Sequence, residues 1–166
     1  MRRMLAGLVA FLLLVVPARV FAKGDTVRIT IKGADLKTPI EITDPKTLET
    51  FNVWTGPGTF SSEPGFNPNK PAFIIDWSQN PIAEPRKGLK RYEVSFYANA
   101  PNMRLVYVVL YQYDPAIKKG YVYLPGRADE WYPLNVRTIL HGVEGKWFHA
   151  WSRWDSVAKP LLEKEK

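Results

Sequence analysis

The chain has 166 residues, 46% of them hydrophobic, a formal net charge of +7 and no cysteine. A chain of this length fits a single domain that can bury a sizeable core. The lack of cysteine excludes disulfide bonds, thiol nucleophiles and cysteine-based zinc sites.

The first 22 residues have the order of features found in a secretory signal peptide. Arg2 and Arg3 precede an uncharged apolar stretch over 4–16, and Ala22 completes a small-residue cleavage site. The apolar stretch is shorter than the ~20 residues that cross a bilayer as a helix. We therefore predict cleavage after Ala22 and an extracytoplasmic mature domain over 23–166, periplasmic or secreted and without a membrane span. An uncleaved N-terminal anchor is the alternative.

Cleavage would also change the charge of the protein. It removes three arginines and leaves 20 basic against 16 acidic residues, a net charge of +4. The remaining basic residues are scattered and form no stripe between exposed aromatic side chains. This pattern does not favour nucleic-acid binding. It leaves open a weak attraction to anionic cell-wall polymers.

The mature chain begins with a pattern typical of a β-hairpin. Apolar and polar side chains alternate over 25–32 and again over 39–43, with turn residues between them. The period then changes at Asp44 and Pro45, which suit the cap and first position of a short helix near 44–51. A metal-binding or catalytic role is the alternative for Asp44.

Residues 52–71 are rich in Gly, Pro, Ser and Asn and predict a long loop. A structureless loop of this length in a compact domain is often functional, although it can also be a plain surface excursion. Trp54 and Phe60 are expected to hold one end of the loop against the core.

Further strands are predicted over 72–77, 91–98, 104–114, 121–124 and 134–140. The 104–114 strand is apolar on both faces, as expected of a central strand. The apolar residues after Ser152 recur at helical spacing and predict a C-terminal helix, although Pro160 disturbs the pattern. Together these elements predict a mostly-β domain, an antiparallel β-sandwich or partly closed barrel of about seven strands.

Aromatic side chains are the main candidates for a binding surface. A turn over 114–120 would place Tyr111 opposite Tyr123 and create a ladder of tyrosines on one face of the sheet. Such rings either fill the core or stack on the sugar rings of a glycan. The predicted ligand-binding residues are Tyr107, Tyr111, Tyr123, Trp131 and Trp54.

Catalytic motifs give no comparable indication. Neither His141 nor His149 lies in a metal-ligand motif, and the sequence contains no Gly-x-Ser-x-Gly. A glycosidase-like reaction needs two opposed carboxylates, and the sequence selects no pair among its candidates. We therefore predict no catalytic residue, metal or cofactor. The candidate carboxylates are Asp76, Glu84, Glu93, Asp114, Asp129 and Glu130.

Several segments of the mature chain resemble a family of exported bacterial proteins with no assigned function. The segments are 40–45, 51–58, 120–126, 130–132, 134–138 and 145–148. The resemblance implies export, and it brings no activity, cofactor or functional residue.

These observations favour a non-catalytic binding or structural module at the bacterial cell envelope, with a cell-wall glycan or an envelope protein as its partner. The alternative is a small secreted hydrolase that acts on cell-wall or extracellular polymer through a carboxylate pair. A third hypothesis is an interaction subunit whose role depends on another protein.

Overall fold

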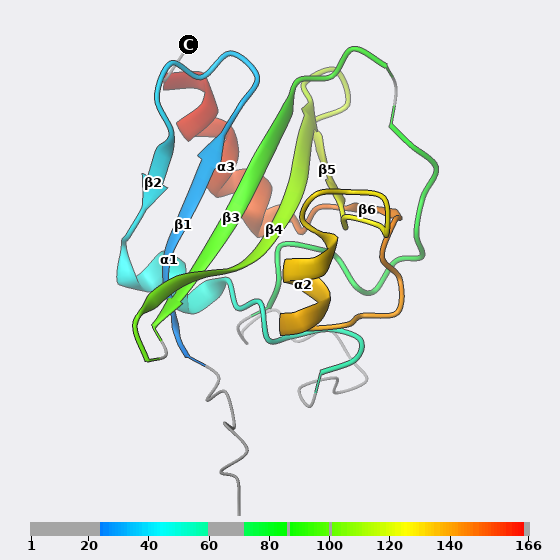
Figure 1. The fold of residues 1–166 in the computed structure, drawn as a ribbon. Coiled ribbons are helices and arrows are strands. Elements are labelled where there is room, and N and C mark those ends of the chain that lie inside the picture. Colours follow the sequence, from blue (N-terminus) through cyan, green and yellow to red (C-terminus); the bar gives the residue numbers. More distant parts are fainter. Residues whose placement is uncertain (1–23, 60–71, 86, 100, 165–166) are drawn as a thin grey trace, which may run out of the picture.

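The computed structural model describes residues 24–59, 72–85, 87–99 and 101–164. Their main feature is one open antiparallel sheet of six strands in the order β2-β1-β3-β4-β5-β6 (Figure 1). The strands are β1 (Thr26–Lys32), β2 (Ile40–Ile42), β3 (Arg91–Asn99), β4 (Met103–Asp114), β5 (Lys119–Tyr123) and β6 (Trp147–His149). The helices are α1 (Pro45–Thr50), α2 (Tyr132–Thr138) and α3 (Ser152–Lys164).

The mostly-β class, the antiparallel sheet and the C-terminal helix are confirmed. Within the described residues the sheet stays open and has six strands, so the sandwich, the barrel and the seventh strand are not confirmed. The predicted signal peptide, 1–22, and the 60–71 part of the predicted loop, with Phe60, lie outside the described residues. No helix in the described part of the chain is long and apolar enough to span a membrane.

The short helix near 44–51 is confirmed as α1, and its start follows from local sequence. Asp44 Oδ2 accepts hydrogen bonds from the backbone N–H and the hydroxyl of Thr47, both at 2.8 Å. Pro45 occupies the first turn, where a missing N–H costs nothing. These contacts explain Asp44 as a helix cap, and the same hydrogen bonds hold the pKa of its carboxyl below the usual range.

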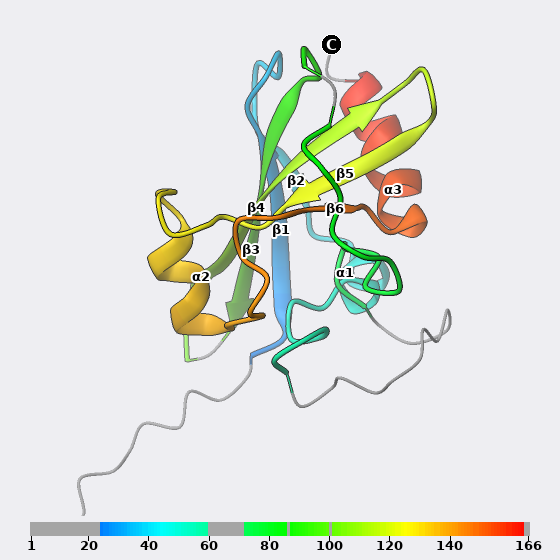
Figure 2. The ribbon, with the colours of Figure 1, turned by 90° about the vertical axis from the view of Figure 1, so that its right-hand side faces the viewer.

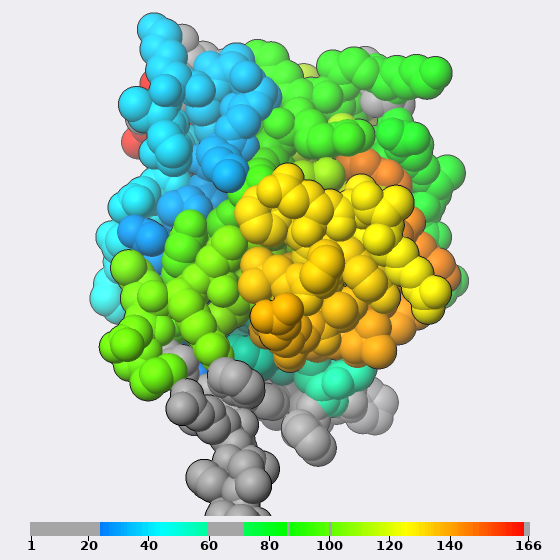
Figure 3. All heavy atoms as spheres, viewed as in Figure 1, coloured from blue at the N-terminus to red at the C-terminus, as the bar shows by residue number. Residues whose placement is uncertain are grey.

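The two faces of the sheet have different coverings. We call the face that carries Ile29, Val94 and Val109 the inner face, and the face that carries Glu93 and Tyr123 the outer face. Figure 2 shows α1 and α3 on the inner side of the sheet and α2 on the outer side. In the space-filling view, α2 and the preceding turn cover part of the outer face, while β1 and β3 reach the surface beside them (Figure 3).

The core lies between the inner face and the helices α1 and α3. Phe51, Phe73, Phe96 and Trp154 are at most 1% exposed. The Phe51 and Trp154 rings meet edge to face with their centroids 5.2 Å apart. Burial of each large apolar side chain contributes roughly 1.5–3 kcal/mol, so aromatic packing is a main source of stability in this chain, which has no cysteine and hence no disulfide.

The predicted tyrosine ladder is wrong because the β4–β5 turn is shorter than expected. Asp114 pairs with Lys119, so Tyr111 lies opposite Val122 and Tyr123 lies opposite Leu110. A shift of one residue in register moves side chains to the other face of a sheet. The tyrosines of β4 and β5 therefore point to opposite faces.

Residues 134–140 were expected to form a strand, and most of them lie in α2 instead. Pro133 stands in the first turn of this helix. The buried Asn135 side chain accepts from Val108 N at 2.9 Å and donates to Val108 O at 2.6 Å. Since β5 ends at Tyr123, which pairs with Leu110, Asn135 occupies the free edge of β4 in place of a neighbouring strand.

The predicted strand over 72–77 is also wrong. This segment forms only single bridges, one between Ala72 and Phe51 and one between Ile75 and Ala150. Phe73 and Ile74 are nevertheless fully buried. The apolar run therefore marks a buried core segment that forms no regular strand, a distinction that periodicity does not make.

Candidate ligand-binding site

Tyr107 and Tyr111 lie in the core with no exposed surface. Tyr107 packs edge to face against Phe73 at a centroid distance of 5.7 Å, and Tyr111 against Trp154 at 5.9 Å. Burial is the main reason why the pKa of both phenols is raised. Neither ring is available to a ligand at the surface, so of the two roles considered for these tyrosines the structure supports core packing.

Tyr123 and Trp131 are half-buried on the outer face. The Tyr123 hydroxyl donates to Asp129 Oδ2 at 2.9 Å, and its ring lies 5.1 Å from that of Trp147. Trp131 Nε1 donates to Glu93 Oε2 at 3.0 Å. Both polar groups are therefore engaged inside the protein, and a ligand here would meet ring surface.

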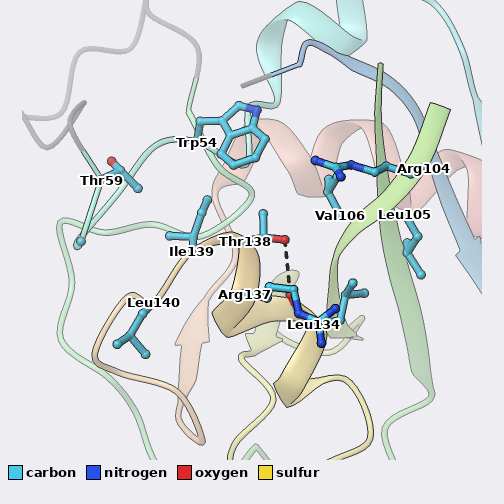
Figure 4. A pocket seen from close by; sticks show the side chains of 11 residues that line it. Trp54, Thr59, Arg104, Leu105, Val106, Leu134, Arg137, Thr138, Ile139 and Leu140 are labelled. Atoms are coloured by element: carbon cyan, nitrogen blue, oxygen red, sulfur yellow. Dashed lines mark hydrogen bonds between the residues drawn. The ribbon is translucent and has the colours of Figure 1, made fainter. Parts of the chain in front are cut away.

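Trp54 lies elsewhere, on a cavity of about 540 Å³ between the start of β4, α2 and the 52–59 loop (Figure 4). Of the five predicted binding residues, it is the one that lines this cavity. The lining residues are Trp54, Gly58, Thr59, Arg104, Leu105, Val106, Leu134, Arg137, Thr138, Ile139 and Leu140.

The loop wall of the cavity is held by local hydrogen bonds. Trp54 N donates to Asn52 Oδ1 at 2.8 Å, and Trp54 Nε1 donates to Gly24 O at 2.8 Å. The indole N–H is thereby used, and the ring is the part that Trp54 offers to the cavity. Gly58 adopts a φ of +74°, and a Cβ at this position would overlap Leu140 O, so only glycine lets the two segments approach.

The opposite wall is one face of α2. Leu134, Arg137 and Thr138 stand at the i, i+3 and i+4 positions that share a helix face, and all three line the cavity. The hydrogen bonds between Asn135 and Val108 fix this helix against β4. Figure 4 shows Trp54 and Arg104 on one side of the cavity and α2 with Arg137 on the other.

The two hydroxyl groups of the lining already donate hydrogen bonds within the protein. The Thr59 hydroxyl donates to Gly56 O at 2.7 Å and the Thr138 hydroxyl to Leu134 O at 3.3 Å. Among the described lining residues there is no carboxylate, and both charged groups are arginines. The cavity is thus aromatic and apolar with a positive charge.

Three of the six carboxylates considered for hydrolysis make contacts that stabilise the fold. Asp76 accepts from Ser78 N at 3.1 Å and Asp114 from Ala116 N at 2.9 Å, so both stabilise turns. Glu93 pairs with Lys32 at 2.9 Å, and this hydrogen bond is the main cause that raises the pKa of Lys32. Each of these groups therefore has a structural role.

His141 is buried beside the core aromatic rings. Its Nδ1 lies 2.6 Å from Pro57 O, and because a carbonyl can only accept, Nδ1 carries the proton. Burial lowers the pKa of His141. Three buried atoms here, His141 Nε2, Tyr107 Oη and Trp77 Nε1, have no hydrogen-bond partner among the described residues. No cluster of three or more metal-ligating side chains occurs in the described ranges.

A half-buried carboxylate, Asp155, was not expected from the sequence. Its carboxylate accepts from Tyr111 Oη at 2.8 Å and from Gly120 N at 2.9 Å, and it joins α3 to the β4–β5 hairpin. Burial raises the pKa of Asp155. Gly120 was the one sequence feature that pointed to this contact, since a glycine inside a strand often marks a place where another group approaches the backbone closely.

Arg104 and Arg137 were not expected from the sequence as site residues, although both line the cavity. Pro133 followed by residues at helical spacing indicates a helix that would carry Arg137. The β-branched residues of the same segment favoured a strand instead.

The fold and the site together define an antiparallel one-sheet domain with a cavity of ligand size. Comparison with models of protein families, with curated proteins and with solved structures finds no match, so the resemblance to an exported family stays a prediction.

Proposed function

We propose that the protein is a non-catalytic, extracytoplasmic binding module of the bacterial cell envelope that holds a small ligand in the cavity beside Trp54. The observation that carries this proposal is the cavity itself. Its volume of about 540 Å³ lies in the ordinary range of ligand sites, and its walls are mainly apolar with a few polar groups.

Two features favour binding over hydrolysis. The described lining holds no carboxylate, and three of the candidate carboxylates, Asp76, Asp114 and Glu93, serve as turn caps or as an ion-pair partner. Export is supported by the signal-peptide pattern of the first 22 residues. Mass spectrometry of the extracytoplasmic protein should find Lys23 at its N-terminus, and Met1 in the membrane fraction would contradict cleavage.

A glycan bound on the outer face is the second candidate. Trp131 is half-buried, and Lys32 Nζ lies 5.8 Å from its ring centroid. Such a ring with a cation beside it can stack on a sugar. Binding of the purified protein to cell wall, lost in Trp131→Ala and kept in Thr138→Trp, would favour this surface over the cavity.

The cavity is tested with a neutral apolar fluorophore, N-phenyl-1-naphthylamine. We expect saturable binding by the wild type and loss of binding by Thr138→Trp, which fills the cavity from α2. Thr138→Val, which keeps the volume of the side chain, is the matched control and should bind like the wild type. Equal binding by the wild type and Thr138→Trp would refute the cavity as the site.

A further inference from the structure

The charge of the cavity restricts the ligand more than its shape does. Arg104 and Arg137 are the charged residues of the described lining, which contains no acidic side chain. Arg137 is exposed and makes no ion pair or side-chain hydrogen bond with any residue in the described ranges. Its five N–H donors are therefore available to a bound group.

The remaining donors are used within the protein. The indole N–H of Trp54 and the hydroxyls of Thr59 and Thr138 all bond to backbone carbonyls. The interior thus offers ring and alkyl surface from Trp54, Leu134 and the buried Val106. A ligand that matches both regions has an apolar body and one charged end.

The position of Arg137 places that charged end at the mouth of the cavity. Leu140, which also lines the cavity, is 57% exposed, so the α2 side reaches solvent. Val106, by contrast, is 3% exposed and lines the part of the cavity away from solvent. An apolar chain directed inward leaves its head group at the solvent side, beside Arg137.

We infer that the cavity binds an amphiphile with a single apolar chain and an anionic head group, a carboxylate or a phosphate, which Arg137 binds at the mouth. The guanidinium group presents paired N–H donors that fit both head groups. Arg104, from β4, also lines the cavity. This inference rests on the proposed function, because it names the ligand class of the same cavity.

The other role open to Arg137 is structural. It stands in the last turn of α2, where a cation interacts favourably with the helix dipole. That role affects the stability of the helix and gives no preference among ligands that share a chain. A comparison of head groups on one chain therefore separates the two roles.

The experiment measures displacement of N-phenyl-1-naphthylamine from the purified protein by decanoate, decyl phosphate and decanol. The three compounds share a ten-carbon chain and differ in the head group. We expect the two anions to bind about tenfold or more tightly than decanol, the effect of one charge-assisted hydrogen bond. Preference between decanoate and decyl phosphate then identifies the head group.

Variants assign the effect to its residue. Arg137→Gln should lose most of the preference for anions and keep the affinity for decanol. Arg127→Gln, an exposed arginine outside the cavity, is the control and should behave like the wild type. Equal affinity for decanol and decanoate in the wild type, or an unchanged preference in Arg137→Gln, would overturn the inference.

The outcome also separates this inference from the proposed function. Binding of the neutral fluorophore and decanol without a preference for anions leaves the cavity as the site and refutes only the anionic head group. Failure of every probe to bind refutes the proposed function itself.

Discussion

Tyr111→Phe removes a hydroxyl that donates to Asp155 Oδ1 at 2.8 Å inside the protein. Asp155 then keeps one of its two described hydrogen bonds, the one from Gly120 N. Loss of a hydrogen bond to a buried charged group costs about 1.5–3 kcal/mol. We therefore expect the free energy of unfolding to fall by about 2 kcal/mol and the melting temperature by roughly 4–8 °C.

Tyr107→Phe is the matched control, since Tyr107 lies on the same face of β4 and is equally buried. Its hydroxyl has no hydrogen-bond partner in the part of the chain that the structure describes, so its removal takes away a desolvation cost. We expect the free energy of unfolding to stay the same or rise by up to about 1 kcal/mol. The assay is urea unfolding, with the denaturant dependence unchanged in both variants. A loss in Tyr107→Phe as large as in Tyr111→Phe would refute this account of the two hydroxyls.

Three further changes test other parts of the fold. Gly120→Ala places a methyl group on Asp155 and should lower the free energy of unfolding by about 3 kcal/mol, measured by urea denaturation. Asn135→Leu removes the side-chain partner of the Val108 N–H and C=O groups. We expect the free energy of unfolding to fall by about 2–4 kcal/mol and the fluorophore to bind no longer. Full binding of the fluorophore would contradict the placement of α2. The pKa of His141 is lower in the folded protein than in the unfolded chain. As the pH falls below about 6.5, this histidine is therefore protonated in the unfolded chain before it is protonated in the folded protein. The free energy of unfolding should then decrease, by at most ~1.4 kcal/mol per pH unit. His141→Asn should lack this part of the pH dependence. If the melting temperatures of the wild type and of His141→Asn change in the same way between pH 7.5 and 5, the prediction is wrong.

Elements that depend on neighbouring residues were predictable from the sequence. Asp44 and Pro45 define the start of α1 within one turn, and alternation identifies β1 and β2 as a hairpin. Elements that depend on distant contacts were not. The segment at 134–140 is rich in strand-forming residues, and α2 is placed by Asn135 through contacts with β4.

The candidate site was only partly predictable for the same reason. Aromatic composition drew attention to five residues, and one of them, Trp54, lies on the cavity. The lining comes from three segments, 52–59, 104–106 and 134–140, which are far apart in the chain. No local sequence pattern indicates that these three segments meet. The expected β4–β5 pairing was also wrong by one residue, so Tyr123 lies on the opposite face of the sheet from Tyr111.

The most direct test of the proposed function is an NMR titration of the ¹⁵N-labelled protein with decanoate. Amide shifts should change, in a saturable way, at residues 54–59, 104–106 and 134–140. Tyr123 and Trp131 on the outer face should stay unchanged at the same concentrations. Shift changes confined to Tyr123 and Trp131, or none at saturating decanoate, would contradict the claim that this cavity is the binding site.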